Sequence, residues 1–113
     1  MTIKLFGLKN CDTCKKALGE IKAAGEAPEF IDIRAEADLA RKVPEWLKAV
    51  GDKLVNRSST TWRALSDEDK TRASGSSLES LLLGNPTLIK RPVIEVDGEV
   101  LIGWNAETKA RIG

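Results

Sequence analysis

The sequence predicts one α/β domain, built on a mixed sheet into which a helical subdomain is inserted. Three observations predict it. Residues 2–33 have the pattern of a strand, a helix and a second strand, residues 38–83 have the pattern of short helices, and residues 93–102 resemble a hairpin. With 113 residues, 42% of them hydrophobic, the chain is long enough to bury one core, so we expect a single domain over residues 1–113.

The opening of the chain predicts a parallel strand pair. Residues 2–6, "TIKLF", are rich in strand formers and end at Gly7, and residues 29–33, "EFIDI", form the second candidate strand. The segment between them starts at Cys11 and then has apolar residues at helical spacing, namely Cys14, Ala17, Leu18, Ile21 and Ala24. Gly25 is a helix-ending signal. A helix that joins two sequential strands in this way makes the strands parallel.

The middle segment predicts an inserted helical subdomain over approximately residues 38–83. Its candidate helices are "DLARKV", "PEWLKAVG", "SDEDKTRAS" and "SSLESLLLG". Pro44 is expected in the first turn of the second helix, where proline is favoured. Ser66, and either Ser76 or Ser77, are expected to cap the later helices.

The end of the chain predicts a hairpin and a final helix. Asp97-Gly98 is a favoured pair for a two-residue turn, and apolar runs flank it on both sides. A short helix is expected after Asn105.

Composition limits the classes of function. The chain has 18 basic and 17 acidic residues, so no overall field attracts nucleic acid or a membrane surface. The N-terminal residues "MTIKLFGLKN" do not form a secretory signal, and no apolar run of about 18 residues occurs. We therefore expect a cytoplasmic protein with neither nucleic acid nor membrane as partner, and its function must come from a local site. A monomer is the expected oligomeric state.

The stretch "KNCDTCKK" holds the two cysteines of a chain that has no histidine. A tetrahedral zinc site made of sulfur and nitrogen ligands from one chain is therefore excluded, and no metal is expected. A site shared between subunits or completed by carboxylates remains the metal alternative. A structural disulfide is disfavoured in a reducing compartment.

Cys11 is the candidate nucleophile. Without histidine, its thiolate must be favoured by backbone N–H groups and the positive end of the helix dipole, helped by Lys9, Lys15 and Lys16. Cys14 falls on the apolar face of the helix, so we expect it to resolve a mixed disulfide formed on Cys11. The alternative for Cys14 is a small buried hydrophobic residue. A C-x-x-C pair between a strand and a helix is typical of thioredoxin-like redox proteins.

Four segments resemble the arsenate reductase ArsC-like family, most closely its YffB-like branch, and also the Spx regulators: "NCDTCKKA", "NRSSTTWRAL", "IKRPVIE" and "LIGW". Their order and spacing cover nearly the whole chain. The resemblance implies a thioredoxin/glutaredoxin-like fold with a helical insertion and an attacking cysteine at Cys11. It also implies a cis peptide between Arg91 and Pro92 in a loop that faces this cysteine. A trans proline at the start of a strand is the alternative.

The resemblance also implies where substrate binds. Arg91 has a planar guanidinium suited to an oxyanion or a glutathione carboxylate. Arg57 is the second candidate. In the sequence pattern it lies one position away from the oxyanion-binding arginine of arsenate reductases. The alternative is that Arg57 is an ordinary solvated arginine. The full candidate substrate-binding set is Lys9, Asn10, Arg57, Arg91 and Pro92. The third arginine of arsenate reductases is missing from "LIGWNAET", which argues against arsenate as the substrate.

We therefore expect a small thiol-disulfide oxidoreductase with no bound cofactor, in which Cys11 attacks and Cys14 resolves. Glutathione is the expected cosubstrate, a small thiol or oxyanion the expected substrate class, and glutaredoxin a further candidate partner. The alternative from another class is an Spx-like regulator that binds RNA polymerase and uses the Cys11/Cys14 pair as a redox switch.

Overall fold

The computed structural model describes residues 2–57, 59–71 and 77–112. The chain divides into two compact units: Met1–Ala37 with Arg91–Gly113, and Asp38–Lys90. Within the described ranges, no helix has the length and apolar character needed to cross a membrane.

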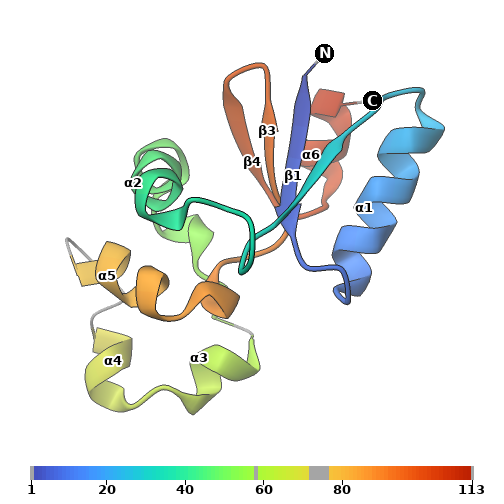
Figure 1. The fold of residues 1–113 in the computed structure, drawn as a ribbon. Coiled ribbons are helices and arrows are strands. Elements are labelled where there is room, and N and C mark those ends of the chain that lie inside the picture. The colour runs from blue at the N-terminus through green and yellow to red at the C-terminus, as the bar shows by residue number, and fades with distance from the viewer. Residues whose placement is uncertain (1, 58, 72–76, 113) are drawn as a thin grey trace. The chain divides into compact units, whose positions relative to one another are not determined.

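The first unit is built on a four-stranded mixed sheet (Figure 1). Its strands are β1 (Ile3–Gly7), β2 (Glu29–Asp32), β3 (Val93–Val96) and β4 (Glu99–Ile102), in the spatial order β2-β1-β3-β4. β1 is parallel to β2 and antiparallel to β3, and β3 is antiparallel to β4. The predicted strand–helix–strand unit and the predicted hairpin are both confirmed.

The hairpin turn has the conformation that its sequence favours. Val96 pairs with Glu99, which leaves a two-residue turn. Asp97 has φ 48° and Gly98 has φ 90°, so both central residues are left-handed. This is the geometry in which an Asp-Gly pair matches the twist of its strands.

Two helices cover one face of the sheet, α1 (Asp12–Ala23) and α6 (Ala106–Ile112) (Figure 1). Alternate residues of β1 and β3 point toward them, as the period of a strand requires. The core cluster beneath these two helices is made of Ile3, Leu5, Cys14, Ala17, Ile21, Ile94, Val96 and Ile112. The predicted apolar stripe of α1 is thus confirmed at its centre, although Ala24 is exposed. Gly25, at φ 90°, follows the end of α1 as predicted.

The second unit is mainly helical. It contains α2 (Leu39–Val50), η1 (Gly51–Leu54), α3 (Thr60–Ala64), α4 (Asp67–Thr71), α5 (Ser77–Gly84) and η2 (Pro86–Leu88). Ser66 caps α4 as predicted, because its Oγ accepts a hydrogen bond from Asp69 N–H at 3.1 Å. Ser77 begins α5, whereas Ser76 lies outside the described residues.

The prediction of a helix start at Pro44 is wrong. A single helix, α2, runs from Leu39 to Val50 with Pro44 inside it. Proline within a helix costs about 3 kcal/mol. Val43 and Trp46, on either side of it, are both 0% exposed. Burying each of these two side chains contributes roughly 1.5–3 kcal/mol, so together they outweigh the cost of the proline and the helix continues through Pro44.

Helix α3 was not predicted from the sequence. Five residues are too few to show a helical period, and none of them is buried. The local signal lies in Ser59, whose Oγ accepts a hydrogen bond from Trp62 N–H at 3.1 Å. This is an N-cap, and it fixes where the short helix begins.

Candidate active site

Cys11 lies where the loop after β1 enters helix α1. It is the N-cap residue, with extended backbone angles of φ −89° and ψ 116°. Its N–H donates to Leu8 O at 3.1 Å, and its carbonyl accepts from Lys15 N–H at 3.0 Å. The side chain makes no capping hydrogen bond and is half-buried. The predicted position at a helix start is confirmed, close to the unpaired N–H groups of the first turn.

Cys14 lies one turn later and is completely buried, with 0% exposure. Gly7 makes room for it: a Cβ on Gly7 would lie 2.5 Å from Cys14 Sγ. Both cysteines are free thiols. Across residues 2–57, 59–71 and 77–112, no group of three or more metal-ligating side chains could hold an ion. The two cysteines thus differ in burial, since Cys11 is half-buried and Cys14 is fully buried.

The surroundings of Cys14 keep it protonated. The pKa of the Cys14 thiol is raised to about 12, mainly by burial, and the hydrogen bond and charge of Cys11 act in the same direction. The backbone of Leu8 and the positive charge of Arg91 act in the opposite direction on this pKa. At neutral pH Cys14 is thus a thiol, held against the neighbouring Cys11 sulfur.

This raised pKa predicts a pH dependence of stability. The folded-state pKa of Cys14, about 12, lies above its ordinary value of 9.0. The stabilisation is therefore fully present below pH 9 and is lost as the pH rises toward 12, because the unfolded chain ionises first. Between pH 9 and 10, the unfolding free energy of the reduced wild type should fall by about 1 kcal/mol relative to Cys14→Ala. Urea denaturation measures this, and parallel pH profiles of the two proteins would contradict it.

Arg91 and Pro92 precede strand β3 in the same unit. The peptide between them is cis, as the family resemblance implied. Pro92 is buried, and its carbonyl accepts a hydrogen bond from Gly103 N–H at 2.8 Å. Arg91 is half-buried, and its charge acts on the Cys14 sulfur. The structure thus brings Arg91 to the cysteine pair.

Lys9 and Asn10 are exposed residues of the loop that leads to Cys11. They share a surface depression of about 490 Å³, which is lined by Leu8, Lys9, Asn10, Asp32, Arg34 and Ala35. Both predicted residues thus lie beside the candidate nucleophile, in a hollow that also carries one carboxylate and a second cation.

The turn after β2 also lines this depression, and its residues were not among the predicted site residues. Asp32 Oδ1 accepts from Arg34 N–H at 2.8 Å and from Ala35 N–H at 2.9 Å. These hydrogen bonds, reinforced by the charge of Lys9, hold the pKa of Asp32 below its usual range. The available signal was topological: parallel neighbouring strands place the segments after them at the same sheet edge.

Arg57 belongs to the second unit. Its Nη1 lies 3.9 Å from Asp52 Oδ2, and its guanidinium lies over the ring of Trp62 at 5.4 Å from the ring centre. Both contacts are made within that unit, and a substrate role for Arg57 stays a prediction.

The segment after β4, where arsenate reductases have their third arginine, carries no arginine before Arg111. Trp104 Nε1 donates to Glu20 Oε2 at 2.6 Å, and Asn105 Oδ1 accepts from Thr108 N–H at 3.0 Å, which caps α6. Arg111 is held by Glu99, with Nε 2.6 Å from Oε2. These residues position α6 and leave this segment without an arginine suited to an oxyanion.

The fold and the site together define a class. A parallel β-α-β unit followed by an antiparallel hairpin and a helix, with a cysteine where the first helix begins, is the thioredoxin/glutaredoxin-like arrangement. The model of the ArsC family matches residues 6–112, and the chain belongs to that family.

Relatives match over most of their length. A protein of Haemophilus influenzae described as uncharacterised is 41% identical over 104 residues, which is 91% of each chain. The structure of a YffB protein is similar with a TM-score of 0.87 and 32% identity over 98% of both chains. An arsenate reductase (ArsC) related protein from Brucella melitensis has a TM-score of 0.79 and 33% identity, over 98% of this chain and 93% of that one. The predicted membership is confirmed.

Proposed function

We propose that this ArsC-family protein is a thiol-disulfide oxidoreductase that uses glutathione as its reductant. The observation that carries the proposal is the pairing of a half-buried cysteine at the start of α1 with a fully buried cysteine one turn later. Cys11 can react with a substrate, and Cys14 lies beside it as the resolving thiol.

The first step is attack by the Cys11 thiolate on one sulfur of a disulfide substrate. A new bond forms between Cys11 Sγ and that sulfur, the substrate disulfide breaks, and the other substrate sulfur leaves as a thiolate that takes a proton from water. No imidazole is available to activate the cysteine, because the chain contains no histidine. The N–H groups of the first helical turn and the dipole of α1 supply the electrostatic support instead.

The second step is resolution by Cys14. While Cys11 is ionised, its charge and hydrogen bond raise the pKa of Cys14. Formation of the mixed disulfide removes both of these influences, whereas the opposing effects of Arg91 and the Leu8 backbone remain. The pKa of Cys14 therefore falls once the mixed disulfide on Cys11 has formed. Cys14 gives its proton to water, and its thiolate attacks Cys11 Sγ. The bond between Cys11 Sγ and the substrate sulfur breaks, and the substrate half leaves as a thiolate that is protonated by water.

Two molecules of glutathione complete the cycle. The first attacks the Cys11–Cys14 disulfide and forms a mixed disulfide on Cys11, and the second displaces it as glutathione disulfide, so that both cysteines return to thiols. Glutathione has two carboxylates and one ammonium group. The guanidinium of Arg91 and the depression with Lys9, Asn10, Asp32 and Arg34 offer complementary charges next to Cys11. Arg57 remains a further proposed contact.

The test is turnover with hydroxyethyl disulfide. The protein, glutathione, glutathione reductase and NADPH are combined, and NADPH consumption is followed with and without the disulfide. We expect catalysed consumption that saturates with glutathione. Catalysis by thioredoxin and its reductase in the complete absence of glutathione, with none when glutathione is supplied, would contradict the proposed reductant.

Arsenate is expected not to be reduced at a significant rate. In the described segment after β4, Asn105 and Trp104 serve structural contacts and Arg111 is paired with Glu99. Losing one charge-assisted contact to a buried oxyanion typically costs a few kcal/mol, which is about a hundredfold in rate or more. The coupled assay with arsenate in place of the disulfide measures this. Arsenate turnover that matches disulfide turnover would contradict the prediction.

A further inference from the structure

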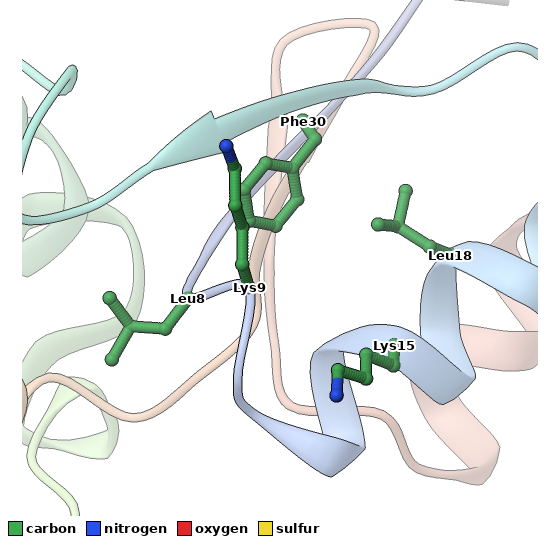
Figure 2. Close-up of a pocket in the computed structure, with 5 residues that line it drawn as sticks. All are labelled: Leu8, Lys9, Lys15, Leu18 and Phe30. Carbon is green, nitrogen blue, oxygen red and sulfur yellow. The ribbon is translucent and has the colours of Figure 1, made fainter.

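A second, smaller pocket adjoins the loop that precedes Cys11. It has a volume of about 150 Å³ and is lined by Leu8, Lys9, Lys15, Leu18 and Phe30 (Figure 2). Leu8 and Lys9 come from the loop between β1 and α1, Lys15 and Leu18 from α1, and Phe30 from β2. Leu8 and Lys9 also line the larger depression, whereas Lys15, Leu18 and Phe30 have no part in the glutathione contacts proposed above.

The pocket is tied to Cys11 through the backbone. The Cys11 N–H is hydrogen-bonded to the carbonyl of Leu8, and the Cys11 carbonyl to the N–H of Lys15. Cys11, Leu18 and Phe30 also pack against the same core cluster. The pocket is therefore built from the loop and the first helical turns that also hold Cys11.

The lining has an apolar interior and a cationic edge. Leu8, Leu18 and Phe30 are all half-buried, so each presents apolar surface that a ligand can cover. A cavity of about 150 Å³ with such walls is large enough for one benzene ring. The pocket is thus suited to an aromatic or branched aliphatic group.

The two lysines set the charge that the ligand should carry. The lining includes Lys9 and Lys15 but no carboxylate. Lys9 is partly balanced by the charge of Asp32. Lys15 forms no ion pair with any residue in the described ranges. Lys15 also lies in the first turns of α1, where the helix dipole favours an anion.

We infer that this pocket selects the substrate: the preferred thiol or disulfide carries an aromatic or branched apolar group together with a carboxylate. The apolar group enters between Leu18 and Phe30, and the carboxylate pairs with Lys15. This inference rests on the proposed function, because it requires a mixed disulfide on Cys11.

The test uses two aromatic disulfides and a small alkylating agent. 5,5′-Dithiobis(2-nitrobenzoate) has a ring and a carboxylate on each half, 4,4′-dithiodipyridine has a ring without a carboxylate, and iodoacetamide has neither. Rates are measured on Cys14→Ser protein, so that only the attack by Cys11 is observed. Each disulfide rate is divided by the iodoacetamide rate of the same variant, which removes any change in the reactivity of Cys11 itself.

Two substitutions distinguish the contribution of the reagent's ring from that of its carboxylate. Leu18→Trp fills the pocket and should lower the normalised rates of both disulfides about tenfold. Lys15→Gln should lower the normalised rate of the carboxylate reagent about two- to fivefold and leave that of dithiodipyridine unchanged. Lys16→Gln is the matched control, since Lys16 is an exposed neighbour of equal charge that does not line the pocket.

The outcomes distinguish this inference from the proposed function. If Leu18→Trp leaves the normalised rates at the wild-type values, or if Lys15→Gln and Lys16→Gln have equal effects, the pocket does not select substrate, although Cys11 is still a nucleophile. If Cys11 reacts with none of the three reagents in native protein, the proposed function itself fails.

Discussion

Replacing Cys11 by serine is expected to lower glutathione-dependent disulfide reduction by about a thousandfold or more. Serine is close to cysteine in size, so the packing of Cys11 against the core cluster should be retained. Its hydroxyl is a poor nucleophile without a general base, and the chain has no histidine to provide one. The coupled assay with hydroxyethyl disulfide gives the rate.

The control for this variant is its stability. The free energy of unfolding of Cys11→Ser in urea should be close to that of the reduced wild type. The replaced side chain is only half-buried and makes no capping hydrogen bond. Thr13→Ser is a matched substitution on the exposed side of the same turn and should keep full activity. If Cys11→Ser retained more than a tenth of the wild-type turnover, Cys11 would not be the attacking atom.

Replacing Gly7 by alanine is expected to destabilise the reduced protein by about 1–3 kcal/mol. The added Cβ would lie 2.5 Å from Cys14 Sγ and 3.3 Å from Cys14 Cβ, at a site with no exposed surface on the cysteine. The core must then shift, or Cys14 must move outward. Urea denaturation under reducing conditions measures the loss of stability.

A double-mutant cycle tests the cause. Cys14→Ala removes the sulfur that would clash with the new Cβ. Gly7→Ala should therefore lower the free energy of unfolding much less in the Cys14→Ala protein than in the wild type. In Gly7→Ala alone, Cys14 should also become more reactive toward iodoacetamide in native protein. Strictly additive free energies in the cycle would show that Gly7 does not act through Cys14.

The parts of the fold that were predicted correctly are those with local causes. The period of Cys14, Ala17 and Ile21 defines helix α1, and the Asp97-Gly98 pair defines the hairpin. Pro44 shows the opposite case. Its local signal is a helix start, but the burial of Val43 and Trp46 keeps α2 continuous, and burial is a property of the folded chain.

The candidate site also combines residues that local sequence predicts with residues that only the folded chain brings together. The position of Cys11 at a helix start followed from strand and helix patterns in the adjacent sequence. The importance of Arg91 came from the family resemblance, since nothing local links it to cysteines far away in the chain. Gly7 was recognised as a strand end, but its contact with Cys14 depends on how β1 and α1 pack. Asp32 required the strand order, which sets the segment after β2 beside the loop after β1.

The central claim is that Cys11 attacks and Cys14 resolves, and trapping the intermediate tests it most directly. Cys14→Ser protein is incubated with glutathione disulfide, digested without reduction, and mapped by mass spectrometry. We expect one glutathione on Cys11 in this variant, and an internal Cys11–Cys14 disulfide in the wild type after the same treatment. A glutathione adduct that accumulates equally in both proteins, or no adduct on Cys11 at all, would contradict the account.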